Sequence, residues 1–120
     1  MKKALLVAGH GSRSLEAQQM FNQIVDYVRE RAEGYELVKG AHMEICGPSI
    51  REVVTEIYND GIKEIIMVPH FLYKGIHLKK DIPNLISVLE QEFEGLSIKL
   101  CEPIGAEESL ADILIKRANA

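Results

Sequence analysis

Ala4-Leu5-Leu6-Val7-Ala8, an unbroken apolar run, is followed at once by Gly9-His10-Gly11-Ser12-Arg13 near the start of this 120-residue chain. A short apolar run that stops at a glycine predicts a strand buried on both faces, as strands are in the middle of a parallel sheet. Residues 65–68, Ile-Ile-Met-Val, form a second run of the same kind. These two runs therefore predict the central strands of an α/β domain.

Two segments that mix polar and apolar residues predict the outer strands of the same sheet. Residues 37–45 include Lys39, His42 and Glu44, and residues 97–101 alternate polar and apolar positions. Because crossovers between parallel strands are right-handed, the favoured order is 2-1-3-4, with the strands numbered along the chain. We therefore predict one three-layer (βα)4 domain over residues 1–120, built on a four-stranded parallel sheet.

Four segments carry apolar residues at the 3.6-residue period of an amphipathic helix. The four stripes are Ala17, Phe21, Ile24, Val25, Val28 and Ala32; Ile50, Val53, Val54, Ile57 and Tyr58; Ile82, Leu85, Ile86, Leu89 and Phe93; and Leu110, Ile113 and Leu114. Ser49 with Glu52 predicts a capping box, and Asp81 with Pro83 suits a first helical turn. We expect no helix to keep an unexplained apolar face.

Composition and charge exclude several classes of function. The formal net charge is −4, whereas a protein that binds a phosphate backbone normally carries a basic excess, so we expect no nucleic-acid partner. No apolar stretch approaches the length of a membrane span, and the first apolar run is too short for a secretory signal. Cys46 and Cys101 show no Cys-x-x-Cys spacing. We expect a cytoplasmic protein with reduced thiols and no membrane partner.

The chemistry-bearing residues follow the predicted strands. In an open α/β sheet, ligands bind beyond the carboxyl ends of the strands, near the switch point between strands one and three. His10 follows the first strand, Glu44 ends the second, and His70 and His77 follow the third. Three histidines and one carboxylate are therefore predicted to meet on one rim. Imidazole ligands suit cobalt, nickel, iron or zinc rather than magnesium or calcium.

Each of these residues also has an ordinary structural interpretation. His10 is either a metal ligand or proton acceptor freed by its flanking glycines, or a histidine hydrogen-bonded within a turn. His77, which we expect at the end of a loop before the third helix, is either a second ligand or simply exposed. Glu44 is either a proton acceptor or third ligand, or a solvated carboxylate. His70 could merely orient its loop, and His42 is expected to be a partly exposed edge residue.

Basic residues on the same rim suggest an acidic ligand. Arg13, Lys74, Lys79 and Lys80 either bind a polycarboxylate or are ordinary surface charges, and a guanidinium can hold a carboxylate through two hydrogen bonds. Ser12, Arg13 and Lys74 are our candidate substrate-binding residues. Nucleotide binding is poorly supported, because Ser14 interrupts the G-x-G-x-x-G pattern. A phosphohistidine enzyme would need an arginine directly before His10, where Gly9 stands.

Taken in order, these motifs resemble the sirohydrochlorin metallochelatases, specifically the short class II cobaltochelatases and ferrochelatases. The resemblance rests on Gly9 to Arg13, on Met43-Glu44 with Pro48-Ser49-Ile50, on residues 68–72 running to Gly75-Ile76-His77 and Asp81-Ile82-Pro83, and on Pro103-Ile104-Gly105. It covers essentially the whole chain as a single chelatase domain.

This resemblance implies a lyase that inserts a divalent metal into sirohydrochlorin without ATP, in cobalamin or siroheme synthesis. It implies that His10 and His77 hold cobalt, iron or nickel, with cobalt favoured, that Glu44 is the family's carboxylate, and that the chain forms a homodimer. Residues 91–96 lack the histidines found in certain nickel-inserting relatives. Two alternatives stay open: a non-catalytic metal carrier using the same histidines, and a flavodoxin-like phosphate or nucleotide binder.

Overall fold

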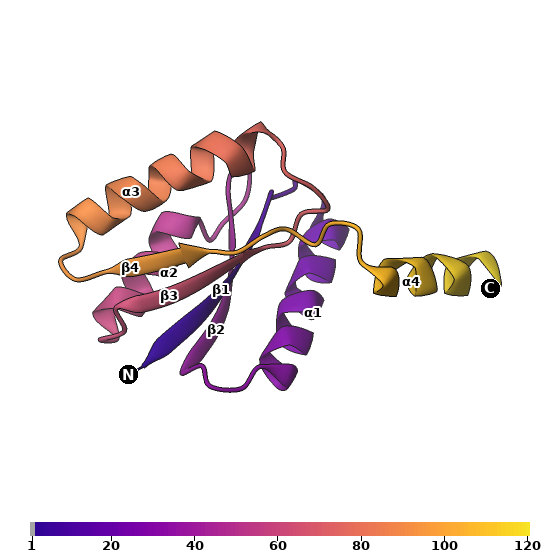
Figure 1. The fold of residues 1–120 in the computed structure, drawn as a ribbon, viewed down its shortest axis with the longest axis horizontal. Coiled ribbons are helices and arrows are strands. Elements are labelled where there is room, and N and C mark those ends of the chain that lie inside the picture. The colour runs from indigo at the N-terminus through magenta and orange to yellow at the C-terminus, as the bar shows by residue number, and fades with distance from the viewer. Residues whose placement is uncertain (1) are drawn as a thin grey trace.

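A computed structural model describes residues 2–120, with His77 described by its backbone alone. Within that range, four parallel strands form one sheet in the order β2-β1-β3-β4 (Figure 1). Their bounds are Lys3–Gly9 for β1, Leu37–His42 for β2, Glu64–Pro69 for β3 and Ser97–Leu100 for β4. The predicted α/β fold and the predicted strand order are both confirmed.

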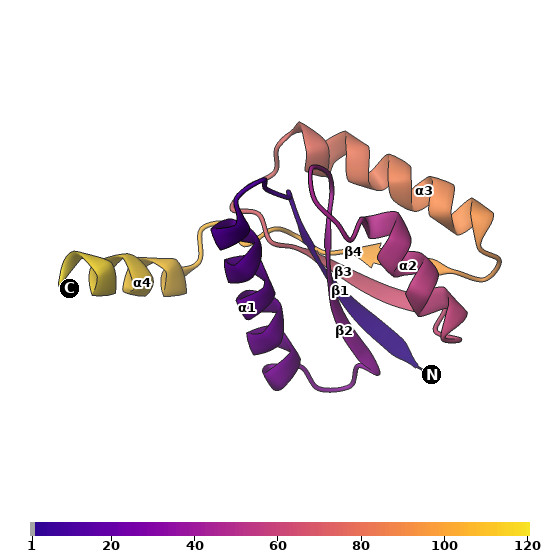
Figure 2. The ribbon, with the colours of Figure 1, turned by 180° about the vertical axis from the view of Figure 1, so that it is seen from behind.

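Three of the four α-helices of the described chain cover the sheet, and one does not. Their bounds are Leu15–Arg31 for α1, Ile50–Asn59 for α2, Ile82–Glu92 for α3 and Glu108–Ala118 for α4. Helix α1 lies on one face of the sheet, whereas α2 and α3 lie on the other (Figures 1 and 2). Helix α4 projects away from the rest of the molecule.

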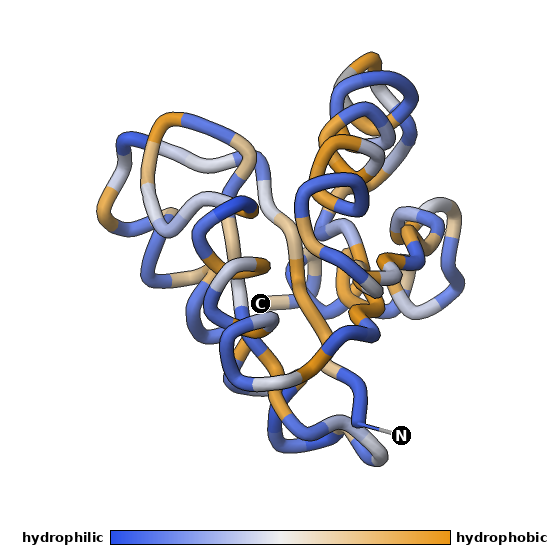
Figure 3. The backbone as a smooth tube through the Cα atoms, turned by 90° about the vertical axis from the view of Figure 1, so that its left-hand side faces the viewer, coloured by the Kyte–Doolittle hydropathy of each residue, from blue (hydrophilic) through white to orange (hydrophobic). Residues whose placement is uncertain are grey.

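The central strand divides its side chains between two apolar clusters. Leu6 and Ala8 of β1 join the larger cluster, which includes the buried residues of α2 and α3. Leu5 and Val7 join the smaller cluster with Phe21 and other residues of α1. Figure 3 shows hydrophobic residues gathered along the strands in the middle of the molecule. Burial on both faces is what the unbroken apolar run predicts.

Two glycines let α1 lie close to the sheet. A Cβ atom added at Gly9 or Gly40 would lie 2.7 or 2.8 Å from the ring of Phe21, closer than packed atoms approach. Phe21 therefore occupies the space that side chains on β1 and β2 would otherwise take. This close approach places the start of α1 directly over the loop that follows β1.

The second strand and the third helix differ from the predicted boundaries. Strand β2 ends at His42 rather than at residue 45, because its partner β1 ends at Gly9, the residue that pairs with His42, and the positive φ of 73° at Ile45 then turns the chain further. The third helix begins earlier than predicted, with a π-helical turn over His77–Asp81. Asp81 is already helical and makes no side-chain cap. The predicted capping box of Ser49 and Glu52 is present in α2.

The last helix contradicts the expectation that no helix keeps an unexplained apolar face. All of α4 belongs to the described chain, and none of its residues is buried. Ile113, Leu114 and Ile115 keep 47%, 68% and 61% of their surfaces exposed. Across residues 2–120, each helix is too short or too polar to cross a membrane.

Candidate functional site

His10 and His70 stand at neighbouring strand ends on the carboxyl rim of the sheet. Strands β1 and β3 pair so that Ala8 lies opposite Pro69, and the His70 amide donates to the carbonyl of Ala8 at 2.7 Å. Each histidine is the residue that directly follows its strand. The structure therefore places both imidazoles where β1 meets β3, which is the predicted switch point.

The imidazole of His10 is held in position by Phe71, which follows His70 in the loop after β3. Its ring stacks on Phe71, with ring centroids 3.8 Å apart and an angle of 18° between the planes. The side chain of His10 is exposed, while Phe71 is buried. A buried aromatic surface beneath an exposed imidazole limits its orientations while leaving its edge accessible to a ligand.

The backbone of Glu44 lies against the loop that carries His10. The amide of Met43 donates to the carbonyl of Gly9 at 2.8 Å, and that of Glu44 donates to the carbonyl of His10 at 3.3 Å. Gly11 has a φ of 98°, and a Cβ there would overlap the carbonyl oxygen of Glu44. Only glycine permits this approach. The structure thus brings Glu44 beside His10 as expected, although Glu44 lies in a loop rather than in a strand.

The backbone of His77 lies in the first helical turn after the rim loop. It begins the π-helical turn, and the amide of Lys79 in that turn donates to the carbonyl of Gly75 at 3.1 Å. The expectation that His77 ends a loop is therefore wrong by one turn. Its side chain lies outside the described part of the structure, so its role as second ligand stays a prediction.

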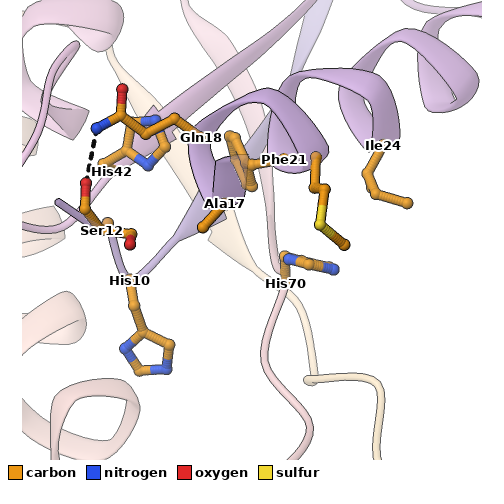
Figure 4. A pocket seen from close by; sticks show the side chains of 10 residues that line it. His10, Ser12, Ala17, Gln18, Phe21, Ile24, His42 and His70 are labelled. Carbon is orange, nitrogen blue, oxygen red and sulfur yellow. Dashed lines mark hydrogen bonds between the residues drawn. The ribbon is translucent and has the colours of Figure 1, made fainter. Parts of the chain in front are cut away.

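Two pockets meet at His10 and His70, which line both of them. The first, of about 460 Å³, lies beneath α1 and is lined by His10, Gly11, Ser12, Ala17, Gln18, Met20, Phe21, Ile24, His42 and His70 (Figure 4). The second, of about 490 Å³, lies along the rim loop and is lined by His10, His70, Phe71, Leu72, Tyr73, Gly75, Ile76 and Leu78. The two histidines therefore mark the boundary between an α1 pocket and a rim pocket.

His42 is buried, which corrects the expectation of a partly exposed edge residue. Only 5% of its surface is exposed, and its ring packs against Phe21 at 4.6 Å between centroids. Its Nδ1 has no hydrogen-bond partner in the described structure. Desolvation lowers the pKa of His42, because burial disfavours the charged imidazolium. Phe21 produces this burial, since Gly9 and Gly40 let it reach the sheet.

Desolvation also lowers the pKa of His70 from its ordinary value. Its ring lies 5.9 Å from that of Phe21, at the mouth of the α1 pocket. A lowered pKa keeps the imidazole neutral near pH 7, and the neutral ring is the form that accepts protons and binds metals. His70 is thus chemically able to act in this site, although the sequence assigns it no definite role.

The candidate substrate-binding residues occupy different surroundings. Arg13 is exposed at the end of the His10 loop, and the Ser12 hydroxyl accepts a hydrogen bond from the amide of Ser14 at 3.0 Å. Lys74 instead pairs with Glu102, with 2.9 Å between Nζ and a carboxylate oxygen. Lys74 also lines a separate pocket with Lys79. The structure therefore brings Ser12 and Arg13 to the His10 loop but places Lys74 on another side of the rim loop.

An exposed group of apolar side chains beside His10 was not anticipated from the sequence. Leu72, Tyr73 and Ile76 are all more than half exposed, and all three line the rim pocket. The signal that could have revealed them is the unusually apolar loop at residues 71–76. Large apolar side chains exposed together mark a binding surface. Among the described side chains, no three of His, Cys, Asp and Glu are arranged to hold a metal ion.

Comparison with known proteins identifies the relatives of this chain. A family model described as CbiX matches residues 4–120. The chloroplastic sirohydrochlorin ferrochelatase of Arabidopsis thaliana is 34% identical over 94% of this chain but only 50% of its own length. The sirohydrochlorin cobaltochelatase of Methanosarcina acetivorans is 32% identical over 97% of this chain and 94% of its own. The chain thus spans half of one relative and nearly all of another.

Two solved structures share the fold. The sirohydrochlorin chelatase SirB of Bacillus subtilis, in complex with cobalt, superimposes with a TM-score of 0.91 at 28% identity, over 99% of this chain and 50% of its own. A CbiX protein from Marinobacter aquaeolei gives a TM-score of 0.81 at 30% identity, over 98% of this chain and 94% of its own.

Proposed function

Because the chain belongs to the CbiX family of sirohydrochlorin metallochelatases, we propose that it inserts a divalent metal ion into sirohydrochlorin. The observation that carries this proposal is the position of His10, exposed at the switch point of the sheet and bordered by the apolar rim. The reaction is proposed to proceed without ATP, since the His10 loop lacks the patterns that bind nucleotide phosphates.

The rim offers what a flat, polycarboxylated macrocycle requires. Leu72, Tyr73 and Ile76 provide exposed apolar surface against which a tetrapyrrole ring could lie. Arg13 is available at the edge for a peripheral carboxylate, which a guanidinium binds through two hydrogen bonds. Lys74 could contribute only after exchanging its pairing with Glu102 for a substrate carboxylate. Arg13 is therefore the stronger candidate for substrate charge recognition.

The chemistry requires a group that both binds a metal and accepts protons. Insertion removes two pyrrole protons while the metal substrate sheds its water ligands. A neutral imidazole performs both tasks, so His10, oriented by Phe71, is assigned to deliver the metal and to accept a proton. His77 is proposed as the second ligand. Glu44 is proposed to relay protons or to orient an imidazole, as carboxylates near metal-binding histidines do.

Cobalt is the favoured metal substrate, with iron and nickel as alternatives. Imidazole ligands accept all three, and selection in cells depends on metal supply as well as on affinity. Residues 91–96 contain no histidine, which argues against the nickel-inserting relatives that carry a histidine-rich loop there. Cobalt would place the reaction in cobalamin synthesis, and iron would place it in siroheme synthesis.

We also propose that the protein acts in the cytoplasm as a homodimer. Cys46 and Cys101 are both free, which suits a reducing compartment. The homodimer follows from the resemblance to the short class II chelatases, and the chain covers 94% of the length of one such relative, the cobaltochelatase of Methanosarcina acetivorans.

An anaerobic insertion assay tests the proposed activity. Sirohydrochlorin is mixed with Co²⁺, Fe²⁺ or Ni²⁺, without ATP, and the absorbance change is followed with and without protein. We expect acceleration with at least one metal, and a slower rate for Glu44→Gln. The matched control is Glu36→Gln, which alters an exposed glutamate just before β2, at the opposite end of that strand.

The same assay separates the chelatase from a metal carrier. A carrier that uses the same histidines would bind metal, measured by equilibrium dialysis, but would leave the insertion rate equal to that of the protein-free control. Metal binding without acceleration by any of the three ions would therefore overturn the proposed activity in favour of the carrier.

A further inference from the structure

The loop that follows β3 carries the surface on which the imidazole of His10 rests, yet it has no strand or helix of its own. Residues 70–75 form this rim loop, between the end of β3 and the π-helical turn. Phe71 lies within it, and its ring stacks on the imidazole of His10. An irregular loop keeps one shape only when contacts with other elements hold it. The geometry at His10 therefore depends on what holds the rim loop.

The connection that follows β4 supplies those contacts. The amide of Ile104 donates to the carbonyl of Phe71 at 2.9 Å, and the amide of Gly105 donates to the carbonyl of Leu72 at 2.8 Å. These two bonds lie beyond the end of the parallel pairing that joins β3 to β4. We call residues 102–105 the clamp segment, because they run beside the rim loop (Figures 1 and 2).

An ion pair joins the same two segments. Nζ of Lys74, in the rim loop, lies 2.9 Å from a carboxylate oxygen of Glu102, in the clamp segment. Both side chains are well exposed, so the pair contributes little free energy. The two backbone hydrogen bonds are therefore the main restraint that the clamp segment places on the rim loop.

Phe71 transmits the position of the clamp segment to His10. Its carbonyl accepts the bond from Ile104, and its ring is buried in the larger apolar cluster. The imidazole of His10 stacks on that ring with 3.8 Å between centroids and 18° between planes. Gly9 and Gly11 flank His10 and have no side chains that could hold its ring. A shift of Phe71 would therefore move the imidazole.

The clamp segment depends on the backbone conformation of Gly105. Its φ is 68°, in the left-handed region that favours glycine. A Cβ atom there would meet no atom closer than the carbonyl oxygen of Pro103, at 3.9 Å. Alanine therefore fits the available space but strains the backbone, and relief of that strain would draw the amide of residue 105 away from Leu72.

We propose that residues 102–105 are a positioning element of the metal-inserting site: by clamping the rim loop, they make Phe71 hold the His10 imidazole in one orientation. This inference rests on the proposed function and deepens the role that His10 has there. The lone pair of an imidazole nitrogen is directional, so insertion requires it to be aligned with the ion and the macrocycle. A displacement of about 1 Å that originates far from the chemistry can lower a rate by about 100-fold.

Glycine substitutions separate the clamp from general backbone strain. Gly105→Ala is expected to lower kcat for metal insertion by about tenfold and to change the KM for sirohydrochlorin by less than about twofold. Gly105→Asn should recover most of the rate, because asparagine tolerates a positive φ. The matched control is Gly34→Ala, in the loop between α1 and β2, where φ is 85° and no atom lies within 4 Å of an added Cβ. That control should leave kcat unchanged.

Aromatic substitutions test whether Phe71 is the link. Phe71→Leu is expected to lower kcat at least as much as Gly105→Ala, whereas Phe71→Tyr keeps the ring and most of the rate. Phe93→Leu is the matched control, because Phe93 lies at the end of α3 and packs on Tyr58 with 4.9 Å between ring centroids. That variant removes a ring packed against the same apolar cluster and should lower stability without lowering kcat.

A double-mutant cycle tests whether the clamp and Phe71 act by one route. If the clamp acts through Phe71, the combination of Phe71→Leu with Gly105→Ala loses no more kcat than Phe71→Leu alone. Losses that multiply would overturn the inference, because Gly105 would then affect the site by another route, such as the direction in which α4 leaves the domain.

Proton NMR of the metal-free protein reports the stacking directly. Protons above the face of an aromatic ring are shielded, so the imidazole protons of His10 should resonate upfield of those of free histidine at the same pH. These signals are assigned by their absence in His10→Ala. Phe71→Leu is expected to abolish the upfield shift, Gly105→Ala to reduce it, and Gly105→Asn to restore it.

The NMR measurement separates failure of the inference from failure of the proposed function. A wild-type protein that inserts no metal, but whose upfield shift is reduced in Gly105→Ala, would overturn the proposed function and support the clamp. Unchanged His10 signals in Gly105→Ala would overturn the inference, as would an equal loss of kcat in Gly34→Ala.

Discussion

The two faces of the sheet differ in how completely this chain covers them. The face under α2 and α3 is packed with fully buried residues such as Val54, Ile57 and Ile65. The other face has α1 alone, and there Ile66 and Val68 remain half-buried while Ile24 is exposed. Both faces carry apolar side chains of similar size. The difference lies in helix α4, which projects away from the sheet instead of packing beside α1 (Figure 1).

This difference separates the side chains that stabilise the fold from those that surround the site. The face under α2 and α3 buries the larger apolar cluster, whereas the face under α1 keeps a pocket and exposed apolar residues such as Met20 and Ile24 beside the functional rim. The face under α2 and α3 therefore contributes more to the stability of the fold, whereas the face under α1 carries the pocket beside the histidines.

The largest expected effect compares truncations on the two faces. Ile57→Ala should lower the free energy of unfolding by about 2–5 kcal/mol, because it leaves a cavity in a fully buried cluster. Ile24→Ala should cost less than about 1 kcal/mol in dilute protein, since part of its side chain already contacts water. Urea denaturation of both variants measures the gap. Equal losses at low protein concentration would contradict the distinction between the faces.

A smaller effect concerns His42, the buried histidine that packs against Phe21 of α1. The pKa of His42 is lowered from 6.5 in the folded protein, so the unfolded chain takes up a proton first as the pH falls. Stability from this group is therefore complete above pH 6.5 and declines as the pH drops from about 6.5 toward the lowered pKa. Burial lowers the pKa of His70 in the same direction, so both histidines contribute.

Denaturation at pH 7.5 and pH 5.5 measures this dependence. His42→Leu removes the titrating group while filling a similar volume, so it should reduce the loss of stability between the two pH values. His70→Gln serves as the comparison, because it removes the more exposed imidazole. A pH dependence that is unchanged in His42→Leu would exclude His42 as its source.

The smallest expected effect concerns the rim, where Ile45 holds a positive φ of 73°. A β-branched residue is strained in this conformation, and glycine is not. Ile45→Gly should therefore raise the free energy of unfolding by about 0.5–1 kcal/mol. Ile45→Ala is the control, because it keeps the Cβ atom and the strain while removing the exposed side chain. An equal gain from both variants would show that backbone strain is not the cause.

The sequence predicts the central strands better than it predicts the position of α4 or the burial of His42. Strands β1 and β3 are recognisable because burial on both faces requires unbroken apolar runs. The departure of α4 from the sheet is not recognisable, because Leu110, Ile113 and Leu114 form the same stripe whether or not they pack against the sheet of this domain. The burial of His42, which was expected to be a partly exposed edge residue, could not be predicted, because it depends on Phe21, whose approach requires glycines at positions 9 and 40.

The residues of the rim also differ in how well the sequence predicts their positions. The meeting of His10 and His70 follows from parallel strands, whose carboxyl ends share one edge. The place of Glu44 depends instead on the turn at Ile45 and on the contact between its carbonyl and Gly11, which no periodic pattern encodes.

The rate of metal insertion by His10→Ala tests the central claim most directly. Wild-type protein and the variant are compared with a protein-free control, using sirohydrochlorin and the metal that the wild type inserts fastest. We predict that His10→Ala falls to the protein-free rate while its free energy of unfolding stays close to that of the wild type, because the His10 side chain is exposed. A variant that inserts metal at nearly the wild-type rate would contradict the assignment of His10 and the account built on it.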